Sequence, residues 1–228
     1  MERIKNCIPD DHATHMACFN VTPHERTLAV KLGMPIFGCD PDLFELGNKS
    51  NSRKIFRECG LLVPAGFEDL QSTEEIVRSL YQLKHDNPAL RKAVVKMNDG
   101  FSGEGNAIFS FKDIDEKNLE SAIRNEFANR MQIVAANLKL ETFLQKFEEM
   151  GGVVESFVEG EPKESPSVQC RITPTGDCEV VSTHDQLLGG ESGQVFIGAK
   201  FPANPEYAVD IGKVGRKVAV AMKKKGVL

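Results

Sequence analysis

Residues 93–111 read AVVKMNDGFSGEGNAIFSF, and this stretch decides how the whole chain is interpreted. AVVKM (93–97) and AIFSF (107–111) are rich in β-branched and aromatic residues, which is typical of strands, so together they predict a hairpin. The loop between them, NDGFSGEGNA (98–107), contains three glycines. Ordinary hairpin loops need only about two to five residues, so the extra length indicates a function beyond connecting two strands.

The glycines of this loop would let backbone N–H groups approach an anion such as phosphate, because glycine has no Cβ and readily adopts positive φ. Lys96 favours the same interpretation, since a lysine inside an apolar strand is costly unless it is paired. Two plainer interpretations stay open: a glycine-rich tip that is merely mobile, and a Lys96 that faces outward from the sheet. The spacing matches neither the P-loop nor the Rossmann fingerprint.

The sequence on both sides of the hairpin alternates between helical and strand patterns. Upstream we expect a helix over 26–33, a strand over 34–38, a helix over 52–59 capped by Ser50 or Ser52, a strand-like run LLVPAG over 61–66, and a helix opened by the capping box at 72–75. Downstream we expect helices over 117–131 and 138–150, strands within 152–161, 167–172, 178–183 and 194–198, and a last helix over 205–226. The change from helix-rich to strand-rich sequence near Gly151 predicts a subdomain boundary there.

Composition narrows the class of protein. With 41% hydrophobic and 27% charged residues the 228-residue chain is of the ordinary globular type, and no apolar run reaches the roughly 20 residues that span a bilayer. The N-terminus has no signal-peptide pattern, so we expect a cytoplasmic protein. A net charge of −5 with dispersed basic residues does not favour a nucleic-acid partner. The six cysteines form no C-x-x-C pair, and His12 and His15 fit a polar loop better than a metal site.

Two further stretches carry polar side chains that suit a binding cleft. GVVESFVEGE (152–161) is explained either by solvent-facing alternation or by a hinge whose backbone binds an adenine while a carboxylate accepts ribose hydroxyls. Thr183–Gln186 ends a strand ahead of a second glycine-rich loop, and neighbours such as His184 and Asp185 point to opposite faces of a strand. One of them could face a cleft together with Gln169 and Arg171. Because there is no G-x-S-x-G motif, covalent catalysis is not expected.

In this order the motifs resemble ATP-grasp ligases, in particular the pheganomycin-type peptide ligase branch. The matching segments are GNKSNSRKIFRECGLLVPAG (47–66), VVKMNDGFSGEGNAIF (94–109), GGVVESFVEGEPKES (151–165) and THDQLLGG (183–190) within a similarity that runs from Asn20 onward. The resemblance implies an α+β ATP-grasp fold, in which two α+β subdomains clasp ATP. It divides the chain into the end of a preceding α/β domain (1–47), an N-terminal subdomain (48–150) with its lid loop at 98–107, and a truncated C-terminal subdomain (151–228).

The resemblance also implies roles for individual residues. Lys49, Lys54 and Lys96 would contact the nucleotide, with Lys96 on its phosphates. Gly100, Ser102, Gly103 and Gly105 would form the lid. Glu155, Ser156, Phe157 and Val158 would be the adenine hinge, with Glu161 as the ribose carboxylate. Arg171, His184 and Gln186 would face the reacting centre, where Arg171 could neutralise an acyl-phosphate.

The implied reaction joins a carboxylate and an amine, such as amino acids or peptides, through an acyl-phosphate, with release of ADP and phosphate. The family's Mg²⁺ ligands, an acid and a Glu-x-Asn motif, would follow Leu228, so the chain itself is assigned no metal ligands. The resemblance thus implies ATP and Mg²⁺ as cofactors of a longer parent enzyme. Without these metal ligands the chain alone is expected to be inactive. The rival hypothesis is a non-catalytic nucleotide-binding or interaction module of a larger regulatory protein.

Overall fold

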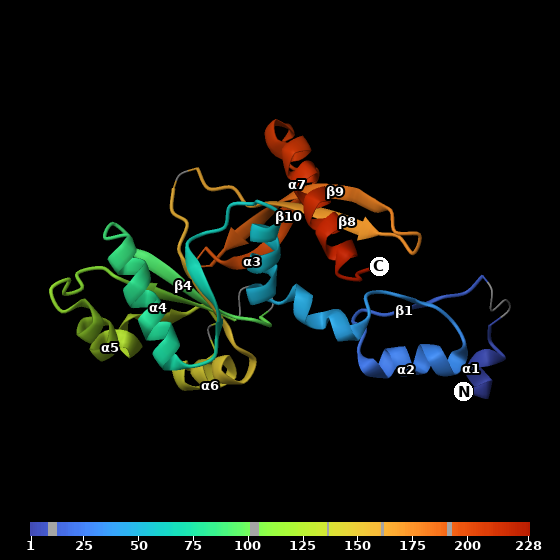
Figure 1. Cartoon of the computed structure of the whole chain (residues 1–228), viewed down its shortest axis with the longest axis horizontal. Coiled ribbons are helices and arrows are strands. Elements are labelled where there is room, and N and C mark those ends of the chain that lie inside the picture. Colours follow the sequence, from blue (N-terminus) through green and yellow to red (C-terminus); the bar gives the residue numbers. More distant parts are fainter. Residues whose placement is uncertain (9–12, 101–104, 136, 161, 191–192) are drawn as a thin grey trace.

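The computed structural model describes residues 1–8, 13–100, 105–135, 137–160, 162–190 and 193–228. In this part of the chain the strands form a five-stranded sheet, a three-stranded sheet and a two-stranded sheet. The five-stranded sheet and its helices lie at one end of the molecule, the three-stranded sheet lies next to it, and the N-terminal segment extends away at the other end (Figure 1). None of the helices in the described residues is long and apolar enough to cross a bilayer.

The predicted hairpin is the centre of the five-stranded sheet. β4 (Lys92–Met97) pairs antiparallel with β5 (Asn106–Ser110), with Lys96 opposite Asn106. The strand order is β3-β7-β4-β5-β6. The edge strands are β3 (Gly66–Leu70) and β6 (Met131–Ile133), and β7 (Gly152–Ser156) lies between β3 and β4. Both ends of the glycine-rich loop therefore leave from strands that are held by neighbours on their other sides.

The alternation of β4 divides its side chains between two faces. Ala93, Val95 and Met97 are buried in the hydrophobic core, whereas Val94 and Lys96 point to the opposite face. The core lies against three amphipathic helices, α4 (Thr73–Asp86), α5 (Leu119–Arg130) and α6 (Leu140–Met150). Burial of apolar surface stabilises a folded protein by about 25 cal/mol per Å², so this helical layer stabilises the first sheet. Lys96 lies on the opposite face of that sheet.

Strand pairing moves the predicted subdomain boundary. Gly151 was expected to open the second unit, but β7 pairs with both β3 and β4 of the first sheet, with Glu155 opposite Val94. The first sheet therefore continues to Ser156, because β7 lies between β3 and β4 and pairs with both. The connection to the second sheet is the segment after Ser156.

The second sheet has the order β10-β9-β8 and carries one long helix. Its elements are β8 (Pro166–Ile172), β9 (Cys178–Gly189), β10 (Val195–Lys200) and α7 (Pro205–Lys224). A Cβ on Gly215 would lie 2.7 Å from Val168 and 3.0 Å from the sulfur of Cys170, so glycine allows α7 to pack closely on β8. The start of α7 is tied to β9, because Asp185 accepts hydrogen bonds from the Tyr207 hydroxyl and the Asn204 amide at 2.7 and 2.9 Å.

The N-terminal segment is a small α/β layer. A parallel two-stranded sheet, β1 (Met16–Ala17) and β2 (Ile36–Phe37), accompanies α1 (Glu2–Lys5), α2 (Pro23–Leu32) and a 3₁₀ helix η1 (Pro41–Gly47). Thr22 and Glu25 form a capping box at the start of α2, and Gly33 ends it with φ +74°.

Two local predictions near α3 (Lys49–Glu58) are wrong in detail. The cap of α3 is Asn48, whose side chain accepts from the Asn51 amide at 2.8 Å, rather than Ser50 or Ser52. Ser50 lies inside the helix, where its hydroxyl bonds to Asn98 at 2.8 Å. The run LLVPAG is not a strand: β3 begins at Gly66, after Pro64, which cannot donate to a sheet ladder.

Candidate functional site

The base of the glycine-rich loop is closed by two glycines in direct contact. A Cβ on Gly100 would lie 2.7 Å from the Cα of Gly105, and a Cβ on Gly105 would lie 2.8 Å from the Cα of Gly100. The amide of Met97 donates to the carbonyl of Gly105 at 2.9 Å. Neither glycine can carry a side chain without moving the backbone. The other lid candidates, Ser102 and Gly103, lie outside the described residues.

Lys49, the first residue of α3, is directed at this loop base. Its ammonium donates to the carbonyls of Gly100 at 3.1 Å and Asn98 at 3.4 Å. Burial lowers the pKa of Lys49, and the nearby charge of Lys96 lowers it further. The charges of Lys49 and Lys96, which lie 47 residues apart in sequence, therefore repel each other, whereas the carboxylates of Asp99 and Glu155 raise the pKa of Lys49 and offset part of this effect. This is the arrangement that an anion would stabilise.

Lys96 belongs to a network of buried charged side chains. Glu155 accepts from both Lys96 and Arg53, and its side chain is only 10% exposed. Arg53 also donates to Glu68 at 2.6 Å and to the carbonyl of Pro64 at 2.7 Å. Arg57 completes the chain with a contact to Glu68 at 2.7 Å. Glu155 thus acts in this structure as the shared partner of two cations, which fixes Lys96 at the loop end of the network.

The hinge residues follow directly after this carboxylate. The Ser156 amide donates to the carbonyl of Ala65 at 2.8 Å, and the Phe157 amide donates to that of Lys92 at 3.1 Å. Lys163 lies 4.3 Å from the centre of the Phe157 ring, within cation–π range. Val158 is 60% exposed. Glu161, predicted as the ribose ligand, lies outside the described residues.

The three residues predicted near the reacting centre are spread along the second sheet. Ser167 on β8 pairs with His184 on β9, and Arg171 lies four residues further along β8, about 13 Å away at 3.3 Å per residue. Arg171 is engaged with Glu179 at 2.5 Å on an exposed surface. Among the described residues, Arg171 is therefore not brought together with His184.

His184 and Gln186 share the face opposite the one that α7 covers, since Asp185 between them bonds to Tyr207. The His184 ring is buried and stacks on Phe201 at 4.6 Å, and its Nδ1 atom finds no hydrogen-bond partner in the part of the chain described. Gln186 accepts from the Ser165 hydroxyl at 3.2 Å.

Lys54 is placed away from the two converging lysines. It lies on α3 and pairs with Asp69 at 2.5 Å, with 40% of its side chain exposed. Arg53, its neighbour, is the buried cation that the sequence analysis missed. The sequence signal was weak, because a single arginine beside an apolar helix position is more often solvated. Asn98 was also missed: it joins the loop to α3 through the Ser50 amide and hydroxyl.

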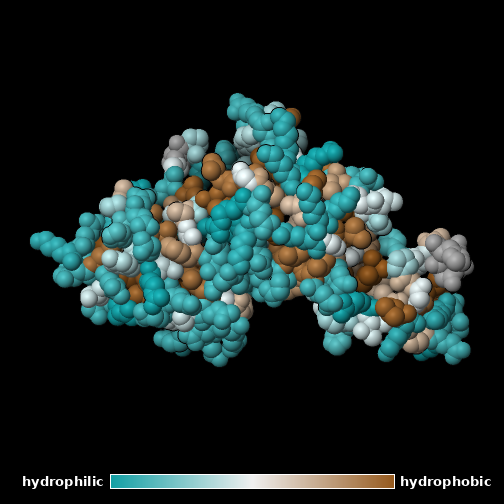
Figure 2. Space-filling model, in the orientation of Figure 1, coloured by the Kyte–Doolittle hydropathy of each residue, from teal (hydrophilic) through white to brown (hydrophobic). Residues whose placement is uncertain are grey.

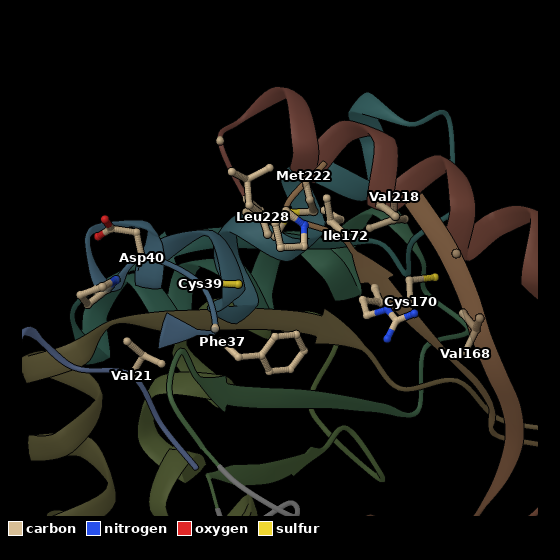
Figure 3. A pocket seen from close by; sticks show the side chains of 18 of the residues that line it. Val21, Phe37, Cys39, Asp40, Val168, Cys170, Ile172, Val218, Met222 and Leu228 are labelled. Atoms are coloured by element: carbon tan, nitrogen blue, oxygen red, sulfur yellow. The ribbon is translucent and has the colours of Figure 1, made fainter. Parts of the chain in front are cut away.

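A large hollow lies elsewhere, between the N-terminal segment and the second sheet. It measures about 1500 Å³ and is mainly apolar, with Val218 and Met222 of α7, Val168 and Ile172 of β8, and Phe37 of β2 around it (Figure 3). Figure 2 shows hydrophobic residues gathered between the end of α7 and the N-terminal segment. Lys49 and Lys96 do not line this hollow, so its size does not make it the site of phosphate chemistry.

No group of three or more His, Cys, Asp or Glu side chains that could hold a metal ion occurs in the part of the chain that the structure describes. His15, one half of the metal pair considered from sequence, stacks edge-on against Phe37 instead, with ring centres 6.0 Å apart. The other half, His12, lies outside the described residues.

The family model of IQCH-like ATP-grasp domains matches residues 42–139 and 119–228, which include the loop base, the charge network, and the five-stranded and three-stranded sheets. The chain belongs to the IQCH-like ATP-grasp family. IQ motif-containing protein H of Danio rerio is 25% identical over 233 residues, covering 89% of this chain and 22% of that protein. The chain thus spans about a fifth of the length of this curated relative.

Solved structures show the same fold for this IQCH-like chain. The biotin carboxylase domain of Hydrogenobacter thermophilus 2-oxoglutarate carboxylase, in complex with MgADP, ADP and bicarbonate, has a TM-score of 0.62 at 17% identity, covering 96% of this chain and 44% of that one. The biotin carboxylase β-γ-ATP complex of Campylobacter jejuni scores 0.64 at 15% identity, covering 93% and 44%. D-alanyl-alanine synthetase A of Vibrio cholerae scores 0.52 at 14% identity, covering 87% and 54%. At these identities the likeness establishes the α+β ATP-grasp fold and nothing about chemistry.

Proposed function

We propose that this chain is an ATP-binding module of ATP-grasp type within a larger protein. The observation that carries the proposal is the convergence of Lys49 and Lys96 at the base of the glycine-rich loop. Lys49 donates there to backbone carbonyls, and its pKa is lowered by burial and by Lys96. A polyphosphate placed between the two lysines would relieve their repulsion, and charged hydrogen bonds to phosphate are among the stronger ones in proteins.

We infer that the other residues predicted for the site bind the rest of the nucleotide. Backbone and side chains of Ser156, Phe157 and Val158 follow Glu155 at the rim of the first sheet and would receive the adenine. The ribose would reach toward Glu161, and the loop 98–107 would cover the phosphates. The described side chains include no group of three or more possible metal ligands, and the proposal for this chain is limited to nucleotide binding.

The second candidate is the ATP-dependent carboxylate–amine ligase that the sequence resemblance implies, including its pheganomycin-type branch. His184 and Gln186 favour it, because they lie on the face of the second sheet opposite α7, where a substrate bound next to the nucleotide would be placed. In that reaction a carboxylate attacks the γ-phosphorus of ATP and releases ADP, and an amine then displaces phosphate to give an amide. The test is ADP release by the full-length protein on adding a carboxylate and an amine together. If ADP release never exceeds the rate with ATP alone, the ligase candidate is rejected and the ATP-binding module remains as the proposal.

Calorimetric titration of the chain with ATP tests the first proposal. We expect Lys96→Met to weaken ATP binding at least tenfold, about 1.4 kcal/mol, because it removes one of two phosphate contacts. Lys112→Met, which removes an exposed lysine after β5, should leave the affinity unchanged. Equal affinities for the wild type and the Lys96 variant would remove Lys96 from the site, and no heat with ATP would reject the binding proposal.

A further inference from the structure

A second hollow lies between the end of α3 and one flank of α7, away from the loop base. It measures about 760 Å³ and is lined by Lys213, Arg216, Lys217, Lys224 and Lys225, with Glu58 as its carboxylate. The two helices stand beside each other in Figure 1. They are joined by the Lys225–Glu58 ion pair at 2.8 Å and by the Cys59 thiol, whose sulfur lies 3.8 Å from the carbonyl of Lys217. The walls of this basic hollow are therefore regular helices rather than loops.

The basic side chains form a stripe on one side of α7. Arg216 and Lys217 follow Lys213 by three and four residues, and Lys224 follows Lys217 by seven, which places these side chains on one flank of the helix. The opposite flank, with Gly215 and Ala219, is buried on the second sheet. Since like charges three and four residues apart destabilise a helix, Lys213 next to Arg216 and Lys217 works against folding. Stability alone does not explain the stripe.

Little of this charge is neutralised within the chain. Lys213 pairs with Asp210, and Lys225 with Glu58. Arg216, Lys217 and Lys224 form no ion pair among the residues that the structure describes. The hollow thus carries five cations against one lining carboxylate, although the whole chain has a net charge of −5. A local excess of this size on a chain of net negative charge favours a small acidic partner, because an extended polyanion would also be repelled by the negative charge of the chain as a whole.

Between the cations the floor of the hollow is apolar. Val220 and Ala221 line it, and Val220 is 39% exposed. Phosphates alone would gain nothing from this floor, whereas a peptide can place a small apolar side chain on it and carboxylates on the rim. We propose that the basic hollow is a docking site for an acidic protein segment that carries several carboxylates around one apolar side chain. This proposal does not depend on nucleotide binding.

Peptide display on the intact chain tests it. A random 12-residue library is selected on the wild type and counter-selected on the triple variant Arg216→Glu, Lys217→Glu, Lys224→Glu. The matched control is Lys112→Glu, Lys117→Glu, Lys146→Glu, which makes the same charge change on exposed lysines elsewhere. We expect enriched peptides with Asp or Glu around an aliphatic residue. Fluorescence anisotropy should show binding at least tenfold weaker to the first triple variant, unchanged to the control, and weaker as salt rises.

Several outcomes would overturn the proposal. Enrichment of neutral or basic peptides would do so, as would peptides that bind both triple variants equally, or no enrichment at all. A labelled 12-nucleotide RNA is compared with the selected peptides. If the RNA binds the wild type more tightly than they do, and binds the first triple variant more weakly than the wild type, the hollow is a nucleic-acid site. Dimerisation of the wild type in analytical ultracentrifugation, abolished by the same variant, would assign it to a second copy of the chain. Circular dichroism of both variants identifies loss by unfolding, and Val220→Asp then provides a second test that should also abolish peptide binding.

Discussion

Replacing Arg53 by methionine should destabilise the chain more than any exposed ion-pair substitution, because Arg53 lies between two buried carboxylates. Its side chain is 7% exposed, and those of Glu155 and Glu68 are 10% and 11% exposed. Breaking a buried pair by removing one partner costs about 3–5 kcal/mol, since a charge stays behind without compensation. Methionine keeps an unbranched apolar stem and removes the guanidinium group together with its ion pairs and hydrogen bonds.

The structure places the expected value at the lower end of that range. Glu155 keeps Lys96 as a partner, and Glu68 keeps Arg57, so neither carboxylate is left alone. The carbonyl of Pro64 loses a donor, which adds about 1 kcal/mol. We therefore expect a loss of about 3 kcal/mol in the free energy of unfolding, or a shift of about 1.5 M in the urea midpoint if m is about 2 kcal/mol/M.

Urea unfolding followed by circular dichroism measures this loss, and Arg57→Met is the matched control. Arg57 contacts the same carboxylate but is 45% exposed, so its removal should cost less than about 1 kcal/mol. A loss below about 1 kcal/mol for Arg53→Met, or equal losses for the two arginines, would show that the network is not the buried anchor described above.

Three further predictions concern Gly100, Glu68 and Tyr207. Gly100→Ala should lower the melting temperature and weaken ATP binding, because its Cβ would overlap the Cα of Gly105, whereas Gly47→Ala, with open space around it, should change neither; equal melting curves would refute the contact. Burial raises the pKa of Glu68, but hydrogen bonds from Arg57 and Arg53 outweigh this and lower it. The stability that Glu68 contributes is therefore present above its ordinary pKa of 4.5 and lost as pH falls below it, and Glu68→Gln should flatten the acid limb of a stability–pH curve. The hydrogen bond to Asp185 raises the pKa of Tyr207 from 10 to about 12, so its contribution is full below pH 10 and lost as pH rises through 12. Absorbance titration at alkaline pH should show this pKa fall in Asp185→Asn, and an unchanged titration would contradict the bond.

Much of the fold was predictable because it rests on local patterns. The hairpin of β4 and β5 follows from two short apolar runs, and α4 follows from its Ser72–Glu75 box, in which Ser72 accepts from the Glu75 amide at 3.2 Å. The position of β7 was not predictable from local sequence, because a strand that pairs with partners about 55 to 90 residues earlier leaves no sign of them in its own residues.

The site was predictable only in part, for the same reason. Lys96 and the glycines of the loop were predictable from their residue types and positions, and the structure adds the contact of Gly100 with Gly105. The partnership of Arg53 with Glu155 spans 102 residues and depends on tertiary packing. Arg171 looked suitable by chemistry alone, but the register of β8 against β9 separates it from His184 and gives it to Glu179.

The place of β7 in the five-stranded sheet also sets the order in which the chain can fold. β3 and β4 have no direct ladder, and β7 enters between them only after the helices α5 and α6 have been made. Such non-local pairing slows folding, and during synthesis the first sheet stays divided until residue 156 has emerged. Glu155 travels on this last strand, so the two cations that it joins cannot be organised before the sheet closes. A nascent chain that ends before β7 should therefore expose to chaperones the two strand edges that β7 covers, and the proposed phosphate site should not yet be assembled.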